Sequence, residues 1–83
     1  MLARNLRVGA DEVDLLVAWG SLVVAVEVKT RLGEDPAEEF TPAKAARFRR
    51  AGEGLRPAPA RYDLVTVCAG REGVGVRWLP GVC

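Results

Sequence analysis

The sequence contains no histidine, and its only cysteines, Cys68 and Cys83, stand apart from each other. The absence of histidine excludes a nucleophile that is activated by histidine and any zinc site with a histidine ligand. Two isolated cysteines do not form the CxxC pair that is typical of metal and redox motifs. We therefore interpret both as reduced thiols, with a disulfide or a metal role as the minority alternative.

Long apolar runs and an excess of one charge are also missing. No apolar run approaches the ~20 residues that span a bilayer, and the N-terminus lacks the pattern of a signal peptide. We therefore expect a cytoplasmic protein with no membrane partner. The 12 basic and 11 acidic residues give a net charge of +1, so the overall charge does not indicate nucleic-acid binding. The 83 residues, of which 49% are hydrophobic, predict one folded domain over residues 1–83.

The chain itself predicts an α/β fold with five strands and one helix in the order βββ-α-ββ. Strands are expected at residues 2–8, 12–19, 22–30, 62–69 and 74–79. Gly20-Ser21 separates two of these runs by two residues, which is typical of a hairpin with a type II′ turn. Thr41 and Pro42 are a helix N-cap and first helical residue, and the predicted helix ends near Gly52.

The hairpin loop fixes which residues face each other. If Gly20 and Ser21 form the loop, Trp19 lies opposite Leu22, and the rest of the ladder follows. One face is then apolar, with Val17, Leu15 and Val13 opposite Val24, Val26 and Val28. The other face pairs Leu16 with Ala25, Asp14 with Glu27, and Glu12 with Lys29.

The predicted opposition of Asp14 and Glu27 needs an explanation. Opposed residues have Cβ atoms ~4.5–5.5 Å apart, and like charges at that distance are destabilising. A Mg²⁺ ion, which binds through one or two carboxylates and keeps several waters, would relieve this repulsion. Lys29 lies on the same side and could hold a phosphate or position a water. The alternative is a solvated hairpin face, in which Glu12 and Lys29 form a surface pair worth ~0–1 kcal/mol.

Four segments resemble a known family. They are LARNLR at Leu2–Arg7, DEVDLL at Asp11–Leu16, VAVEVKTR at Val24–Arg31 and TPAK at Thr41–Lys44. Together they resemble the YraN-like family, which belongs to the restriction-endonuclease-like PD-(D/E)XK nuclease superfamily, near the Holliday-junction resolvases. The resemblance covers nearly the whole chain, and the flanking RNLR and TPAK segments make it specific.

The resemblance implies a site as well as a fold. Asp14, Glu27 and Lys29 correspond to the aspartate, glutamate and lysine of the motif, so the two acids would hold Mg²⁺ or Mn²⁺. In such nucleases the metal activates water for attack on a phosphodiester, and the lysine assists. Glu12 corresponds to a further acidic residue of the family and is a candidate additional ligand.

The implied fold is a restriction-endonuclease-like mixed β-sheet. Members of the family usually begin with an N-terminal helix, whereas this chain starts at its first expected strand. The fold is therefore expected to lack that helix, and the sheet face left open suggests a homodimer. The expected strand at residues 74–79 is an edge strand and a candidate seam for such a dimer.

The predicted helix carries two kinds of residue. Its inward stripe consists of Ala45, Phe48, Gly52 and Leu55. Its basic residues, which Arg31 extends toward the expected site, are Lys44, Arg47 and Arg50. These side chains contact nucleic-acid phosphates in one interpretation and are merely solvated in the other.

Three residues outside these groups receive structural interpretations. Asp63 is expected to cap the chain or to pair with an arginine rather than to bind metal. Trp19 and Trp78 are expected to pack against the protein rather than to stack on bases.

The residues leave three functions open. The first is a metal-dependent nuclease acting on nucleic acid, with DNA favoured over RNA. The second is a non-catalytic nucleic-acid-binding or assembly module with a degenerate nuclease fold. The third is a small structural protein whose charges are solvated.

Overall fold

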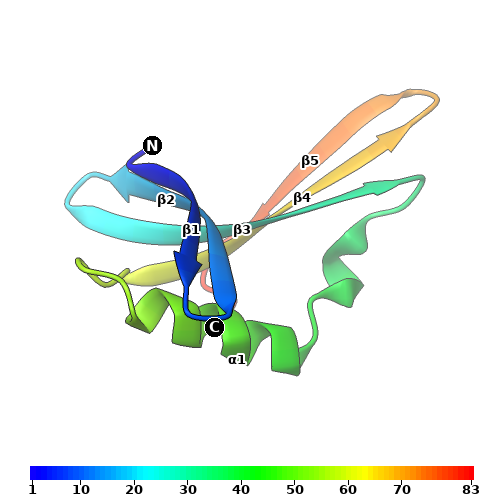
Figure 1. Ribbon diagram of the computed structural model, residues 1–83. Coiled ribbons are helices and arrows are strands. Elements are labelled where there is room, and N and C mark those ends of the chain that lie inside the picture. The colour runs from blue at the N-terminus through cyan, green and yellow to red at the C-terminus, as the bar shows by residue number, and fades with distance from the viewer.

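A computed structural model describes residues 1–83 and contains one five-stranded sheet, one α-helix and one 3₁₀ helix (Figure 1). The elements are β1 (Ala3–Val8), β2 (Asp11–Trp19), β3 (Leu22–Leu32), η1 (Pro36–Glu39), α1 (Pro42–Glu53), β4 (Arg61–Gly70) and β5 (Gly73–Leu79). The order βββ-α-ββ is confirmed. The 3₁₀ helix is an additional element between β3 and α1 that the sequence did not predict.

The sheet is mixed, with the spatial order β1-β2-β3-β4-β5. The first three strands form an antiparallel meander, β3 and β4 are parallel, and β4 and β5 form an antiparallel hairpin. A parallel pair requires a crossover connection, and η1 and α1 supply it. Figure 1 shows α1 under one side of the meander and the β4–β5 hairpin projecting away from it.

The turn between β2 and β3 forms as predicted. Gly20 has a φ of +62°, and the pairs run from Trp19 opposite Leu22 to Leu15 opposite Val26. The ladder ends there, so Asp14 and Glu27 are not paired residues of the sheet. The strands therefore separate at the position where the sequence predicted opposed carboxylates.

Near Asp14, the side chains of β2 also stop alternating regularly between the two faces of the sheet. β1 and β2 pair on both sides of Asn5 and Asp14, but these two residues do not pair with each other. Asn5 has a φ of +53°, in the left-handed region that asparagine tolerates better than most residues. Beyond this kink, Val13 lies in the same core cluster as Leu16. The prediction that Val13 faces Val28 was wrong, because the pairing of β2 with β3 ends at Leu15 and Val26, and Val13 and Leu16 of β2 pack into one cluster instead of alternating strictly.

The core lies between the sheet and α1. Its buried members are Val13, Leu16, Ala25, Phe48, Ala51 and Tyr62. Phe48 packs edge-on against Tyr62, with ring centroids 5.3 Å apart. A Cβ at Gly52 would overlap the Tyr62 ring, so this glycine allows the helix to lie close to β4. Of the predicted inward stripe, Phe48 and Gly52 are buried and Leu55 packs against the core, whereas Ala45 is half-buried and lies outside the cluster. Ala51 is buried in addition.

The N-terminus of α1 forms as the sequence predicts. The Lys44 amide donates to Thr41 Oγ1 at 3.3 Å, and Pro42 occupies the first turn. The helix is shorter and more polar than a membrane-crossing segment requires, and no other helix of the structure meets that requirement either.

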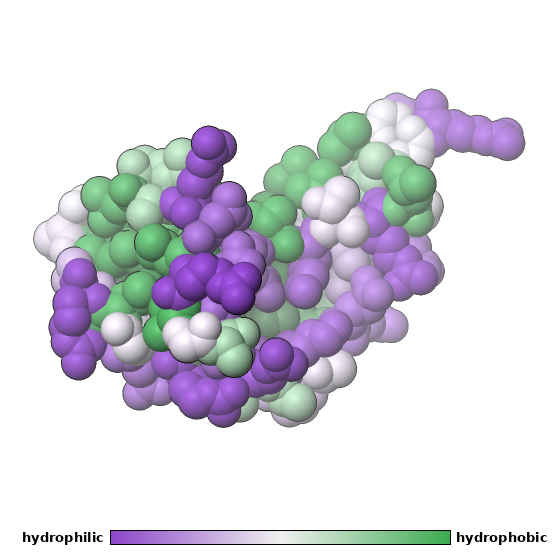
Figure 2. Space-filling model, viewed as in Figure 1, coloured by the Kyte–Doolittle hydropathy of each residue, from purple (hydrophilic) through white to green (hydrophobic).

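The opposite face of the sheet, here called the open face, carries no helix. Its buried polar residue is Asp63, which pairs with Arg61 as expected. Trp19 and Trp78 stack on each other, with ring centroids 5.5 Å apart, so both pack against the protein, although each ring stays about half exposed. Large apolar side chains that remain exposed on this face are Trp19, Leu22, Leu32, Val74, Val76 and Trp78. Figure 2 shows apolar surface along the projecting hairpin.

Candidate functional site

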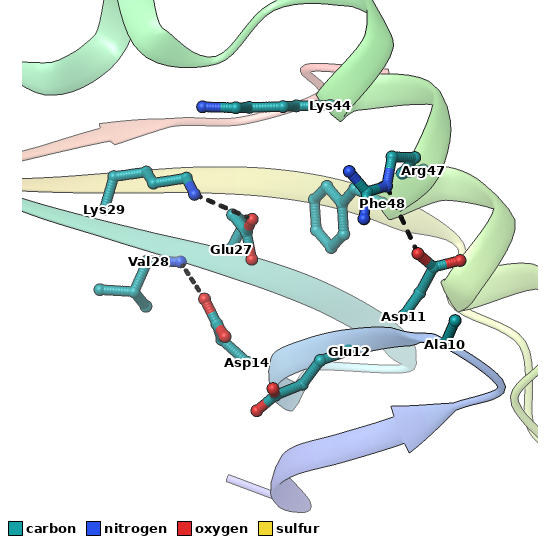
Figure 3. Close-up of a pocket in the computed structure, with 10 residues that line it drawn as sticks. All are labelled: Ala10, Asp11, Glu12, Asp14, Glu27, Val28, Lys29, Lys44, Arg47 and Phe48. Atoms are coloured by element: carbon teal, nitrogen blue, oxygen red, sulfur yellow. Dashed lines mark hydrogen bonds and ion pairs between the residues drawn. The ribbon is translucent and has the colours of Figure 1, made fainter.

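A polar pocket of about 420 Å³ lies between the separated ends of β2 and β3 and the first turns of α1 (Figure 3). Its lining consists of Ala10, Asp11, Glu12, Asp14, Glu27, Val28, Lys29, Lys44, Arg47 and Phe48. The sequence could not show whether the helix and the acidic residues face the same way. The structure places Lys44 and Arg47 in the same pocket as the three motif residues.

The separation of the strands positions Asp14. Because the β2–β3 ladder ends at Leu15 and Val26, the Val28 amide has no backbone partner on β2. It donates instead to Asp14 Oδ2 at 2.8 Å, so a side chain takes the place of a ladder carbonyl. This hydrogen bond fixes the Asp14 carboxylate in the gap between the strands, at the floor of the pocket.

Glu27 is the most perturbed acid of the pocket. Its side chain is 18% exposed and lies 3.6 Å from Lys29 Nζ, measured from Oε2. Burial and then the nearby Asp14 carboxylate raise the pKa of Glu27 to about 7, although Lys29 acts in the opposite direction. The carboxylate therefore lacks enough positive charge to stay ionised at low cost near neutral pH.

Glu12 lines the pocket but does not join this pair. Its side chain is exposed, and Figure 3 shows its carboxylate directed away from Glu27. Lys29 pairs with Glu27 and not with Glu12, so the predicted Glu12–Lys29 surface pair was wrong. No group of three or more Asp, Glu, Cys or His side chains lies close enough to hold a metal ion. The pocket thus offers two adjacent carboxylates, Asp14 and Glu27.

The basic residues of α1 are organised by an aspartate that sequence reasoning missed. Asp11 lies within 3.5 Å of both Arg47 Nε and Arg50 Nη2 and ties the helix to the start of β2. Lys44 forms no ion pair and projects over the pocket mouth. The only sequence signal for Asp11 is its place beside Glu12 at the start of the DEVDLL segment. Arg50 therefore contacts Asp11 and does not line the pocket.

Arg31 lies elsewhere than its spacing from Lys29 predicts. Its guanidinium pairs with Glu34 at 3.3 Å and with Glu39 of η1 at 2.8 Å. It does not line the pocket. The prediction that Arg31 extends the site was based on its spacing from Lys29, but the acidic loop that follows β3 holds this side chain elsewhere.

The two cysteines are both free, and neither lies in the pocket.

Comparison with known proteins places the chain in a family. Residues 1–67 match the family model described as "Uncharacterised protein family UPF0102". The chain belongs to this family. The matched span contains every residue that lines the pocket.

Individual relatives agree with this assignment. A UPF0102 protein of Symbiobacterium thermophilum is 39% identical over 82 residues, which cover 88% of this chain and 70% of that protein. One from Streptomyces coelicolor is 39% identical over 92% of this chain and 67% of its own length. One from Mycolicibacterium vanbaalenii is 42% identical over 89% of this chain and 69% of its own length. These proteins carry the family name alone.

Proposed function

We propose that this UPF0102 protein is a metal-dependent nuclease-like protein that hydrolyses a phosphodiester bond of nucleic acid in the pocket. The observation that carries the proposal is the pair formed by Asp14 and Glu27. Two carboxylates share a partly buried pocket, and burial together with the neighbouring Asp14 carboxylate raises the pKa of Glu27 to about 7. A divalent metal that binds through one or two carboxylates and keeps its waters suits this pair.

Each residue of the pocket has a part in the proposed reaction. Asp14 and Glu27 would hold Mg²⁺ or Mn²⁺, which when bound supplies an acidified water and neutralises charge on the phosphate. The Val28 amide keeps Asp14 in place. Glu27 must first lose its proton, because metal ligands bind as carboxylates. The Lys29 ammonium, beside Glu27, stabilises negative charge that develops on the phosphate.

The rim of the pocket supports nucleic acid as the partner. Lys44 is free to contact a phosphate, and Arg47 retains guanidinium donors beyond its contact with Asp11. These are contacts to the backbone and carry no sequence information. The resemblance to the restriction-endonuclease-like superfamily favours DNA over RNA. A homodimer and a cytoplasmic location complete the proposal.

One observation favours the second candidate, a non-catalytic nucleic-acid-binding or assembly module. Only two carboxylates converge in the pocket, and Glu12 is directed away from them. A pocket that had lost turnover would still keep the basic rim. This candidate predicts salt-sensitive binding of nucleic acid without cleavage in Mg²⁺ or Mn²⁺.

Calorimetric titration of Mn²⁺ and Mg²⁺ tests the metal site directly. We expect one site in the wild type, and we expect Asp14→Asn and Glu27→Gln each to weaken binding at least tenfold. Both substitutions keep side-chain size, and the amide introduced by Asp14→Asn retains an oxygen that accepts from Val28. Glu12→Gln is the matched control and should change the affinity less than twofold. Unchanged affinity in both Asp14→Asn and Glu27→Gln would overturn the site.

A cleavage assay on linear and branched DNA then separates the two candidates. The nuclease predicts metal-dependent cleavage that Lys29→Met reduces more strongly than it reduces metal binding. Lys44→Ala with Arg47→Ala should weaken DNA binding and lower its salt dependence, because two phosphate contacts are lost. Arg4→Ala with Arg71→Ala removes the same two charges from exposed positions outside the pocket and controls for net charge. Binding without cleavage would support the module instead.

A further inference from the structure

The two edges of the sheet differ in how they are protected. β1 is short, has a left-handed residue at Asn5, and carries Arg4 and Arg7. Kinks and charged residues of this kind discourage pairing with another chain. β5 has no left-handed residue other than Gly73 at its start, and its single charged residue, Arg77, pairs with Asp35. Its residues from Gly73 to Trp78 are all exposed, and no other element covers them.

The β4–β5 turn determines which backbone groups point outward from β5. Gly70 pairs with Gly73 across a two-residue turn, so this closing pair exchanges both of its hydrogen bonds. Hydrogen-bonded pairs then alternate along the ladder with pairs whose amides face away from the partner strand. The N–H and C=O groups of Val74, Val76 and Trp78 consequently point to the free edge.

These three residues are self-complementary about Val76. An antiparallel copy of β5 with its Val76 opposite this Val76 places Val74 opposite Trp78 of the copy, and Trp78 opposite its Val74. All three of these pairs use outward-pointing amides, so each exchanges two hydrogen bonds. On the other face, Gly75 lies opposite Arg77 of the copy and leaves room for that side chain.

Side chains on the open face support the same contact. Val76 is 68% exposed, Val74 is 67% exposed and Trp78 is 47% exposed, and none of the three is charged. With the exposed part of Trp19, which stacks on Trp78, they offer on the order of 400 Å² of apolar surface. A standard interface buries ~800 Å² per partner, so edge pairing on this strip suits a dimer of micromolar strength.

The charges near β5 stay outside this contact. Arg77 is the only charged residue of the strand, and its guanidinium pairs with Asp35 at 3.2 Å on the face that carries η1. Pairing at the edge therefore leaves no buried charge without a partner. The pocket lies at the other side of the sheet, between β2, β3 and α1, and remains accessible.

We propose that the outer edge of β5 binds a second copy of this chain, with Val76 of the two copies on a two-fold axis, to form a continuous ten-stranded sheet. The edge hydrogen bonds set the register, and the apolar strip formed by Val74, Val76, Trp78 and Trp19 supplies the buried surface. This proposal identifies the interface of the homodimer that is part of the proposed function. The interface does not depend on whether the pocket binds metal.

Sedimentation velocity over a concentration series tests the dimer. The wild type should change from the 8.9 kDa monomer to a species of twice that mass as the concentration rises through the micromolar range. Val76→Lys and Val76→Glu should each weaken association at least tenfold, because like charges then oppose each other across the axis. An equimolar mixture of the two variants should restore the dimer as a heterodimer.

Leu32→Lys is the matched control. Leu32 is exposed on the same face but lies on β3, two strands from the edge. Circular dichroism checks that each variant is folded. The edge contact is supported if Leu32→Lys still dimerises, if neither Val76 variant dimerises alone, and if the mixture of the two Val76 variants does. A monomeric wild type, or a dimer that Leu32→Lys abolishes and Val76→Lys does not, overturns the proposal.

Discussion

Two acidic residues on adjacent strands lie on opposite faces of the sheet and have opposite surroundings. Asp63 on the open face is 1% exposed and accepts four hydrogen bonds, two from Arg61 and one each from Trp78 Nε1 and the Gly81 amide. Glu27 on the helix-covered face has one ammonium at 3.6 Å and a carboxylate as its neighbour.

The ionisation of the two side chains follows from these partners. Burial acts to raise the pKa of Asp63, but its hydrogen bonds from Arg61, Gly81 and Trp78 lower the pKa below its usual value. Burial and then the nearby Asp14 carboxylate raise the pKa of Glu27 to about 7, because Lys29 offsets them only in part. A fully satisfied carboxylate stabilises the fold, whereas an under-satisfied one in an open pocket indicates a binding or catalytic role.

The largest effect is expected for Asp63→Asn. An amide cannot accept all four hydrogen bonds, and Arg61 loses its counter-charge, so we expect a loss of about 3 kcal/mol in the free energy of unfolding. Urea denaturation at pH 7 measures it. The stabilisation by Asp63 is present above the unfolded pKa near 3.8 and is lost as the pH falls through the lower folded pKa, so the difference should shrink in acid.

Glu72→Gln, in the exposed β4–β5 turn, is the control for Asp63→Asn and should change stability by less than about 0.5 kcal/mol. A loss below about 1 kcal/mol in Asp63→Asn would show that the hydrogen bonds of this cluster are not stabilising, and the contrast between the two acids would fail.

Glu27→Gln should have the opposite sign. Because the folded pKa of about 7 lies above the unfolded value of 4.5, ionised Glu27 destabilises the fold, and wild-type stability falls as the pH rises between these values. After allowance for solvent screening, we expect Glu27→Gln to stabilise the metal-free protein by about 2 kcal/mol at pH 8 and to have little effect near pH 4.5. Urea denaturation across this pH range measures the difference. A variant that is less stable at pH 8 would contradict the stated cause.

Lys29→Met is expected to have the smallest effect. Lys29 lowers the pKa of Glu27, so its removal should move that pKa further above 7. Stability at neutral pH should change by less than about 1 kcal/mol, because the partly exposed ammonium contributes little. The measurement is the pH midpoint of the Glu27 carboxyl carbon signal by NMR. A midpoint that moves down, or not at all, would exclude Lys29 as the group that acts on Glu27.

Local signals predicted most of the fold. Gly20-Ser21 defined the hairpin register, and Thr41-Pro42 defined the start of α1, because turns and caps depend on a few neighbouring residues. The kink at Asn5 and Asp14 could not be predicted in this way. It depends on a left-handed backbone and on a side-chain bond to the Val28 amide, and neither changes the hydrophobic pattern.

The placement of the candidate site residues was predicted where it depends on one hairpin, and it was wrong where it depends on other segments. Asp14, Glu27 and Lys29 belong to β2 and β3, and their proximity followed from the register. Arg31 was misplaced because its partners lie in η1 and the loop before it. The role of Asp11 was missed because its partners lie on α1.

The hydrogen bond from Val28 to Asp14 spans only 14 residues of chain, all within the β2–β3 hairpin. Hairpins form in ~1–10 μs, whereas a parallel pair such as β3–β4 forms slowly because its contacts are distant in sequence. The floor of the pocket can therefore assemble before α1 covers it.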